Sequence, residues 1–214
     1  MVAAKICGLT DSGALAAAVA GGAAFVGFVF YPPSPRALSG AAAGRLAAEV
    51  PAGVRKVGLV VDADDALIEA VLAEAPLDLL QLHGAETPER VAEVRRRFGL
   101  PVMKAIKVAA REDIAAAEAF EEVADILLFD AKAPRSLADA LPGGNGLVFD
   151  WNLLRARRPR CPWMLSGGLD AGNVAMAVAI SGAAMVDVSS GVEDSPGHKS
   201  PARIEAFLDA VRGL

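Results

Sequence analysis

The stretch Lys5-Ile6-Cys7-Gly8-Leu9-Thr10 carries the chain from a short apolar strand into a loop. Its thiol stands at the strand end, where a side chain projects into open space rather than into a core. Because side chains alternate along a strand, Lys5 lies on the same side as Cys7, and a nearby ammonium favours the reactive thiolate. We therefore expect Cys7 to act as a base or nucleophile; a buried structural cysteine is the alternative.

The same transition from strand to loop recurs along the chain. Apolar runs that predict eight strands begin near Ala3, Ala24, Arg55, Asp78, Pro101, Ala124, Pro162 and Ala184. Helical patterns lie between them, at residues 12–20, 40–49, 63–75, 88–98, 111–122, 170–180 and 201–211. This alternation predicts a parallel sheet, and eight repeats favour its closure into a (β/α)8 TIM barrel over an open doubly wound sheet. Catalytic side chains of such a barrel gather at the carboxyl ends of its strands.

The length and charge of the chain limit its architecture and its partners. Its 214 residues suffice for one large core, so residues 1–214 are expected to form a single barrel domain. The net charge of −5 argues against a nucleic-acid partner, which normally needs a basic face. An anionic small ligand would need positive charge gathered locally.

Cysteine usage and hydropathy indicate a cytoplasmic protein. The two cysteines show no paired spacing, as expected for a reduced intracellular protein, and the sequence has no metal-ligand spacing. Residues 12–35 carry no charge, which on length alone could suggest a membrane span. Alanine dominates this run, and Gly21-Gly22 interrupts it, so a small-residue helix followed by a buried strand explains it better. Lys5 and Asp11 argue against an apolar secretory signal.

Two charged residues stand at positions suited to chemistry. Asp130 ends the apolar run 126–130, and a carboxyl group held against an apolar wall can keep its proton and act as a general acid. A helix cap or a pair with Lys132 is the alternative. Arg36 follows a loop stiffened by three prolines, which holds a guanidinium ready to bind a carboxylate; a solvated surface arginine is the alternative.

Glycine-rich loops follow the last two predicted strands. Ser166-Gly167-Gly168 ends the seventh, and Ser189-Ser190-Gly191 follows the eighth. Glycines let backbone N–H groups approach an anion, and the loops after strands seven and eight are the usual phosphate site of this barrel. His83 ends the fourth strand and either hydrogen-bonds a substrate or is a satisfied structural histidine. His198 is given no role.

The interval between the sixth and seventh predicted strands is the longest. It holds Gly143-Gly144-Asn145-Gly146, followed by Phe149-Asp150-Trp151. An extended loop in a compact domain is usually functional, so we expect a lid or a ligand wall over 131–150, with the helix compressed into 151–155; a simple turn is the alternative. Cys161 stands just before the seventh strand and is expected at the opposite end of the barrel from Cys7, too far for a disulfide.

Several separated motifs together resemble the phosphoribosylanthranilate isomerases, enzymes of tryptophan biosynthesis. They are KICGLT at 5–10, FVFYPPSPR ending at Arg36, LQLHG at 80–84, LLFD ending at Asp130, GGNG with FDW at 143–151, LSGGL at 165–169 and VDVSSGVE at 186–193. They agree with the family in order and in spacing. The chain departs at Leu147-Val148, where the family often carries a polar or basic pair, so ligand contacts from these side chains are not expected.

The resemblance implies an Amadori rearrangement of N-(5-phosphoribosyl)anthranilate to the carboxyphenylamino-deoxyribulose phosphate. Cys7 would be the general base and Asp130 the general acid, while Arg36 would hold the anthranilate carboxylate. The remaining implied contacts are His83 and Asp187 near the substrate, and Gly167, Gly168, Ser189, Ser190 and Gly191 around its phosphate. Internal proton transfers need no hydride acceptor, so neither a cofactor nor a metal is expected.

Two other functions compete with this one. A histidine-pathway or dual-substrate sugar isomerase of similar fold would be expected to use aspartate in place of Cys7. A non-catalytic phosphate-binding barrel would have no use for Cys7 and Asp130 together at the mouth. The expected partner is a small anionic phosphoribosyl compound, with neither nucleic acid nor membrane, and the chain is expected to be a monomer or a homodimer.

Overall fold

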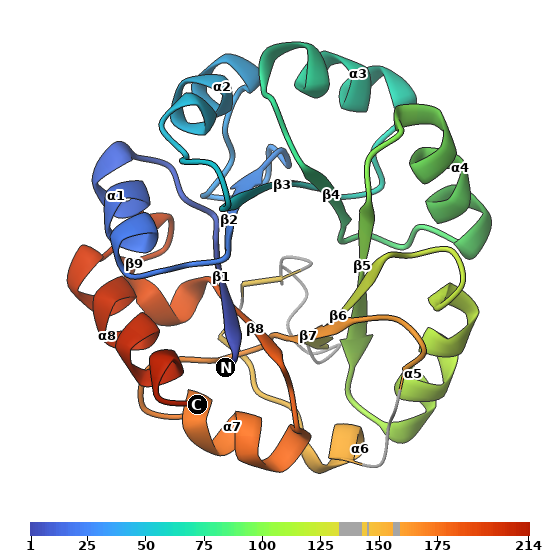
Figure 1. Cartoon of the computed structure of the whole chain (residues 1–214). Coiled ribbons are helices and arrows are strands. Elements are labelled where there is room, and N and C mark those ends of the chain that lie inside the picture. The colour runs from blue at the N-terminus through green and yellow to red at the C-terminus, as the bar shows by residue number, and fades with distance from the viewer. Residues whose placement is uncertain (133–142, 145, 156–158) are drawn as a thin grey trace.

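The computed structural model describes residues 1–132, 143, 144, 146–155 and 159–214. A closed barrel of eight parallel strands, in the order of the sequence, forms its centre, and Figure 1 shows helices ringing it. The strands are β1 (Ala3–Cys7), β2 (Phe25–Val29), β3 (Arg55–Val60), β4 (Leu79–Leu82), β5 (Val102–Val108), β6 (Ile126–Ala131), β7 (Trp163–Leu165) and β8 (Met185–Val188). Each begins within two residues of its predicted start. The predicted (β/α)8 barrel is thus confirmed, and the open sheet is excluded.

Helices cover the outside of the barrel, and a short ribbon follows the last barrel strand. The helices are α1 (Ser12–Ala20), α2 (Gly40–Ala48), α3 (Asp65–Glu74), α4 (Pro88–Phe98), α5 (Arg111–Ala116), α6 (Asn152–Arg155), α7 (Val174–Ser181) and α8 (Pro201–Arg212). Short 3-10 turns lie at η1 (Ala117–Phe120) and η2 (Ser190–Val192), and the ribbon pairs β9 (Glu193–Ser195) with β10 (His198–Lys199). The sequence patterns did not predict this ribbon.

Local hydrogen bonds explain where two helices depart from prediction. The Asp64 carboxylate accepts from the Leu67 N–H at 2.9 Å, so α3 begins after this cap rather than at residue 63. The Asp170 carboxylate accepts from the Gly172 and Asn173 N–H groups at 2.8 and 3.0 Å. This turn occupies the residues predicted as the first part of a helix, and α7 therefore begins at Val174.

The barrel interior positions the functional side chains. A buried apolar cluster fills it, made of Phe25, Val57, Leu79, Met103, Ala105, Ile126, Leu128 and Met164. On β6, Ile126 and Leu128 belong to this inner cluster, so the alternation of side chains turns Asp130 inward at the top of the same row. On β1, Ile6 packs in the outer cluster between sheet and helices, which turns Cys7 and Lys5 inward.

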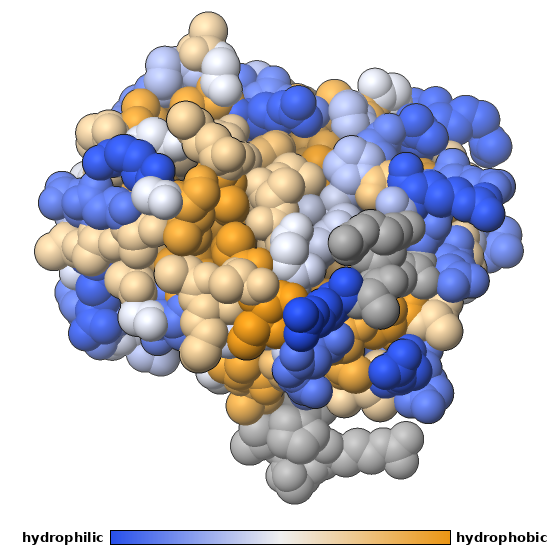
Figure 2. Space-filling model, turned by 60° about the horizontal axis from the view of Figure 1, so that its bottom comes forward, coloured by the Kyte–Doolittle hydropathy of each residue, from blue (hydrophilic) through white to orange (hydrophobic). Residues whose placement is uncertain are grey.

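The uncharged run at 12–35 is accounted for by α1, β2 and the loop that follows. Ala14, Leu15 and Ala18 of α1 are buried, and no helix in the described part of the chain is long and apolar enough to cross a membrane. Figure 2 shows a band of apolar side chains beside hydrophilic ones on the outer surface. Exposed large apolar residues include Met176 of α7 and Val148.

Candidate active site

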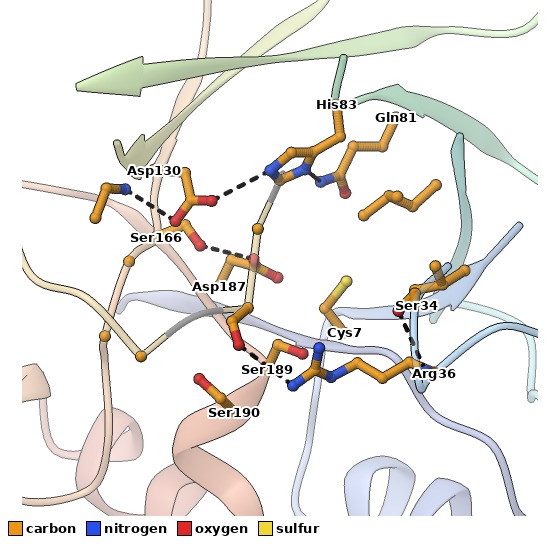
Figure 3. Close-up of a pocket in the computed structure, with 18 of the residues that line it drawn as sticks. Cys7, Ser34, Arg36, Gln81, His83, Asp130, Ser166, Asp187, Ser189 and Ser190 are labelled. Carbon is orange, nitrogen blue, oxygen red and sulfur yellow. Dashed lines mark hydrogen bonds and ion pairs between the residues drawn. The ribbon is translucent and has the colours of Figure 1, made fainter. Parts of the chain in front are cut away.

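A cavity opens among the carboxyl ends of the strands. Nine of the predicted site residues line it, namely Cys7, Arg36, His83, Asp130, Gly167, Gly168, Asp187, Ser189 and Ser190. Gly191 is not among the lining residues; it packs against the Leu169 backbone, where a side chain would clash. Figure 3 shows side chains from opposite sides of the barrel converging on this space. The strand ends thus bring together groups that are far apart in the sequence.

Cys7 lies above a buried ion pair. The Lys5 ammonium donates to Asp187 Oδ1 at 2.8 Å, and the Ser166 hydroxyl donates to Asp187 Oδ2 at 2.9 Å. Both members of the pair are buried, Lys5 completely. Although burial opposes its charge, the nearby Asp187 carboxylate raises the pKa of Lys5 above its ordinary value. Both carboxylate oxygens of Asp187 therefore accept hydrogen bonds from residues at the floor of the cavity.

This ion pair changes the expectation for the Cys7 thiol. Burial, the largest influence, raises the pKa of Cys7; the Lys5 ammonium lowers it, and the Asp187 carboxylate raises it again. The net result is a pKa above the ordinary value of a thiol. Lys5 therefore favours the thiolate, as predicted, but burial has a larger effect on the pKa of Cys7, and Asp187 adds to the effect of burial. Neither Cys7 nor Cys161 takes part in a disulfide in the described structure.

Asp130 is held by two hydrogen bonds. Its Oδ1 accepts from the Ala131 N–H at 2.9 Å, and its Oδ2 lies 3.2 Å from His83 Nε2. The alternative partner, Lys132, donates instead to Asp113 at 2.8 Å, so a surface pair does not explain Asp130. His83 Nδ1 in turn lies 2.8 Å from the amide nitrogen of Gln81.

Gln81 is not among the residues predicted from the sequence to form the site. It is completely buried and lines the cavity. A polar residue two positions beyond the inward-facing Leu79 was the signal that could have identified it, because side chains two apart share a face.

The described part of the long β6–β7 interval forms a wall of the cavity, in agreement with the predicted ligand wall. Gly143, Gly144, Gly146 and Leu147 line the space, whereas residues 133–142 and 145 lie outside the described structure. A Cβ at Gly143 would lie 2.7 Å from His83 Nε2 and 3.1 Å from Asp130 Oδ2. Glycine therefore lets the wall lie directly over the hydrogen bond between these side chains. Leu147 faces the cavity despite the expectation that it would make no ligand contact.

Arg36 is buried and is already paired within the protein. Its Nε donates to Glu193 Oε1 at 2.7 Å, and its Nη2 donates to Glu193 Oε2 at 2.8 Å and to the Gly144 carbonyl at 3.4 Å. One bidentate edge of the guanidinium is thus occupied by Glu193. Among the described residues, Nη1 has no hydrogen-bond partner. The solvated surface alternative for Arg36 is wrong.

Glu193 is shared between two cations. The Lys199 ammonium donates to Glu193 Oε1 at 2.7 Å, and also to the backbone carbonyl and hydroxyl of Ser189 at 2.9 and 3.1 Å. Burial alone would raise the pKa of Glu193, but the hydrogen bonds from Arg36 and the charge of Lys199 lower it. Burial, with Arg36 nearby, lowers the pKa of Lys199. One carboxylate between two cations leaves an excess positive charge beside the Ser189 loop.

No group of three or more His, Cys, Asp or Glu side chains within the described ranges could hold a metal ion. The backbone at Gly167 and Gly168 adopts φ values of 92° and 62°, which glycine tolerates without strain. This conformation lets the β7–α7 loop turn sharply at the cavity edge, next to the Ser189–Ser190 segment.

Fold and site together define a class: a (β/α)8-barrel enzyme with a thiol, a carboxyl group and glycine-rich loops at its carboxyl-terminal mouth. A family model described as N-(5'phosphoribosyl)anthranilate (PRA) isomerase matches residues 4–210. The chain belongs to the PRA isomerase family, and it is an isomerase.

Individual relatives agree with this assignment along the whole chain. An N-(5'-phosphoribosyl)anthranilate isomerase of Rhodospirillum centenum is 60% identical over 210 residues, covering 98% of both chains. That of Parvibaculum lavamentivorans is 57% identical over 208 residues, covering 97% of both. The crystal structure of the Thermotoga maritima isomerase is 37% identical, with a TM-score of 0.89 over the full length of both chains. Another isomerase structure, in complex with reduced 1-(o-carboxyphenylamino)-1-deoxyribulose 5-phosphate, is 35% identical, with a TM-score of 0.86 and full coverage of both chains.

Proposed function

We propose that this chain converts N-(5-phosphoribosyl)anthranilate into 1-(2-carboxyphenylamino)-1-deoxyribulose 5-phosphate, an Amadori rearrangement in tryptophan biosynthesis. The observation that carries the proposal is the placement of Cys7 and Asp130 on the wall of one cavity. Such a rearrangement needs an acid and a base that reach the same sugar. The match to the PRA isomerase family over residues 4–210 supports this substrate.

In the proposed reaction, Asp130 protonates the ring oxygen of the sugar. The nitrogen lone pair then opens the ring and leaves an iminium ion. Cys7, as the thiolate, removes the proton from the adjacent sugar carbon, and the resulting enolamine tautomerises to the ketone. One proton enters from the acid and one leaves to the base, so no net oxidation occurs.

Local positive charge supports binding of a doubly anionic substrate. We assign the anthranilate carboxylate to Nη1 of Arg36, since the other edge of the guanidinium binds Glu193. The phosphate is assigned to the backbone around Gly167-Gly168 and Ser189-Ser190, where the cluster of Arg36, Glu193 and Lys199 supplies one excess positive charge. A chain of net charge −5 thus has an electrostatically suitable site.

His83 and Asp187 are proposed to act mainly through their partners. His83 holds the Asp130 carboxyl group, and Asp187 holds Lys5 beneath Cys7, although both also line the cavity. We further propose that residues 1–214 form one catalytic domain, because β1 pairs with β8 and so closes the barrel from both ends of the chain. A cytoplasmic location stays a prediction.

A fluorescence assay with freshly prepared phosphoribosylanthranilate tests the proposed reaction. Loss of the anthranilate signal at a rate proportional to enzyme concentration is the expected result. A folded protein that leaves this signal unchanged would overturn the proposal, and turnover of the histidine-pathway analogue alone would replace it.

The expected monomer or homodimer is tested separately by light scattering. One related structure is titled as monomers generated from the dimeric isomerase of Thermotoga maritima, and that protein is 36% identical to this chain.

A further inference from the structure

A row of three buried side chains leads from the barrel floor to Asp130. The amide nitrogen of Gln81 lies 2.8 Å from His83 Nδ1, and His83 Nε2 lies 3.2 Å from Asp130 Oδ2. Gln81 is completely buried, while His83 and Asp130 are each 5% exposed. Figure 3 shows the three groups in line along one wall of the cavity.

The order of donors along this row fixes the proton on the imidazole ring. An amide nitrogen can only donate, so His83 Nδ1 must be the acceptor and carry no proton. The ring proton of the neutral histidine then lies on Nε2, which donates it to Asp130 Oδ2. Because the Ala131 N–H already binds Oδ1, both oxygens of Asp130 receive N–H donors. This arrangement stabilises the carboxylate that remains after the acid has given up its proton.

The other end of the Gln81 amide is unsatisfied. Its Oε1 is buried and has no hydrogen-bond partner among the described residues. Figure 3 shows this oxygen turned away from His83, toward the space enclosed by the site. A buried acceptor without a donor is costly, and a substrate N–H or O–H entering the cavity would satisfy it.

We propose that Gln81 is a positioning residue for Asp130, holding His83 in the tautomer that donates to this acid, and that its free oxygen accepts a hydrogen bond from the substrate. The inference rests on the proposed function, because it takes Asp130 to be the general acid. The substrate donor belongs to the secondary amine or the hydroxyl groups of the amino sugar. A donor on Oε1 polarises the amide and strengthens the hydrogen bond from its N–H group to His83. Substrate binding would therefore hold His83, and through it Asp130, more firmly in place.

Other charged groups near the row leave this assignment intact. Cys7, Arg36 and Asp187 face the same cavity, and Lys107 stands opposite Asp130 in the register of β5 with β6. In the described structure, none of these is hydrogen-bonded to His83. Lys104 donates to the carbonyls of Leu82 and Gly84 beside it, and to the Glu86 carboxylate. Among the described side chains, Gln81 is therefore the group that contacts Nδ1 of His83.

Nitrogen NMR of the folded enzyme reads the tautomer directly. The chain has two histidines, His83 and His198, so a long-range ¹⁵N–¹H spectrum contains only two ring systems. His198→Gln assigns them and serves as the matched control, because its side chain is exposed and outside the cavity. We expect a pyridine-type Nδ1 and a pyrrole-type Nε2 for His83. Gln81→Glu, which offers only acceptors, should place a proton on Nδ1.

Steady-state kinetics test the link to the acid and to the substrate. Gln81→Met keeps a similar volume but removes both the donor and the acceptor. Its kcat is expected to fall about tenfold, less than on loss of the acid itself, and its KM to rise about tenfold. An unchanged KM would overturn the substrate contact. An unchanged kcat, or a wild-type enzyme with the proton on Nδ1, would overturn the positioning role.

The NMR result does not depend on turnover. If the expected tautomer is seen in a protein that fails to convert phosphoribosylanthranilate, the proposed function is wrong and the hydrogen-bonded row stands. If an active enzyme carries the opposite tautomer, the proposed function stands and the role of Gln81 is wrong.

Discussion

Arg36 and Glu193 meet edge to edge, with Nε 2.7 Å from Oε1 and Nη2 2.8 Å from Oε2, although 157 residues separate them in the sequence. Sequence patterns placed Arg36 at the site but gave no sign that its bidentate edge is already used. Glu193 therefore decides which face of the guanidinium a substrate can approach. Through Lys199 it also connects this guanidinium to Ser189 and the proposed phosphate loop.

Glu193→Ala is expected to raise KM about tenfold or more, with a smaller change in kcat, because Arg36 loses its orientation. The change also leaves two buried cations without a counter-ion, so the free energy of unfolding should fall by about 3–5 kcal/mol. Urea denaturation and steady-state kinetics measure the two effects. Asp194→Asn is the matched control, since the neighbouring carboxylate pairs with Arg203 at the surface. An unaltered KM in Glu193→Ala would separate Glu193 from the substrate site.

Cys7→Ala and Asp130→Asn are each expected to lower kcat roughly a hundredfold or more, because each removes one of the two proton-transfer groups. Circular dichroism should show an intact fold, and fluorescence kinetics measure the loss. Cys161→Ala, at the opposite end of the barrel, should retain activity and controls for the removal of a thiol. Near-normal turnover in either active-site variant would exclude the role assigned to that residue.

Asp187→Asn is expected to lower the pKa of Cys7. Burial raises this pKa and the Asp187 carboxylate raises it further, whereas Lys5 lowers it. Removing the negative charge leaves the Lys5 ammonium unopposed, so the thiolate should appear at lower pH. The ultraviolet absorbance of the thiolate, followed against pH in a Cys161→Ser background, measures the midpoint. A midpoint that stays in place or moves upward would contradict the electrostatic role of Asp187.

Stability at acid pH should depend on Glu86. Burial alone would raise its pKa, but the Lys104 ammonium 2.6 Å away and several hydrogen bonds hold the pKa below the ordinary 4.5. A carboxylate whose pKa is lowered on folding stabilises the folded state at any pH above its pKa in the unfolded chain. This contribution is lost as the pH falls through its pKa in the folded protein. Urea denaturation as a function of pH should therefore show unfolding free energy declining below about pH 4.5.

In Glu86→Gln, this acid-dependent decline should be shallower. The unfolding free energy at neutral pH should also be about 3 kcal/mol lower, because Lys104 is left buried without its partner. Glu205→Gln on α8, whose side chain is exposed, is expected to keep the wild-type profile. Parallel profiles for Glu86→Gln and the wild type would contradict the assignment.

The periodicity of the sequence was sufficient to predict the barrel and the position of Cys7 and Asp130 at its mouth. Cys7 and Asp130 end apolar strands whose alternation turns them inward, and this is local information. Gln81, Glu193 and Lys199 were not assigned roles, because their importance lies in contacts rather than in position along a strand. The ribbon of β9 and β10 brings Glu193 and Lys199 to the site. So short an element has no hydropathy pattern from which it could be predicted.

Long-range electrostatics explain why the effect of Lys5 on the pKa of Cys7 could not be predicted from the sequence. Lys5 lies beneath Cys7 as predicted, but the effect of its charge depends on Asp187, which is 182 residues away. Sequence spacing alone could not indicate that partner. The pKa of the thiol therefore depends on the closed barrel as well as on the KICGLT motif.

The pairing of β1 with β8 places Lys5 opposite Asp187 at the seam where the barrel closes. In the order of the chain, Cys7, the proposed base, is synthesised well before Asp187. Contacts of such large sequence separation form late in folding, since closing a long loop costs entropy. A chain that has not yet added β8 to the barrel therefore has the cysteine but lacks the ion pair beneath it.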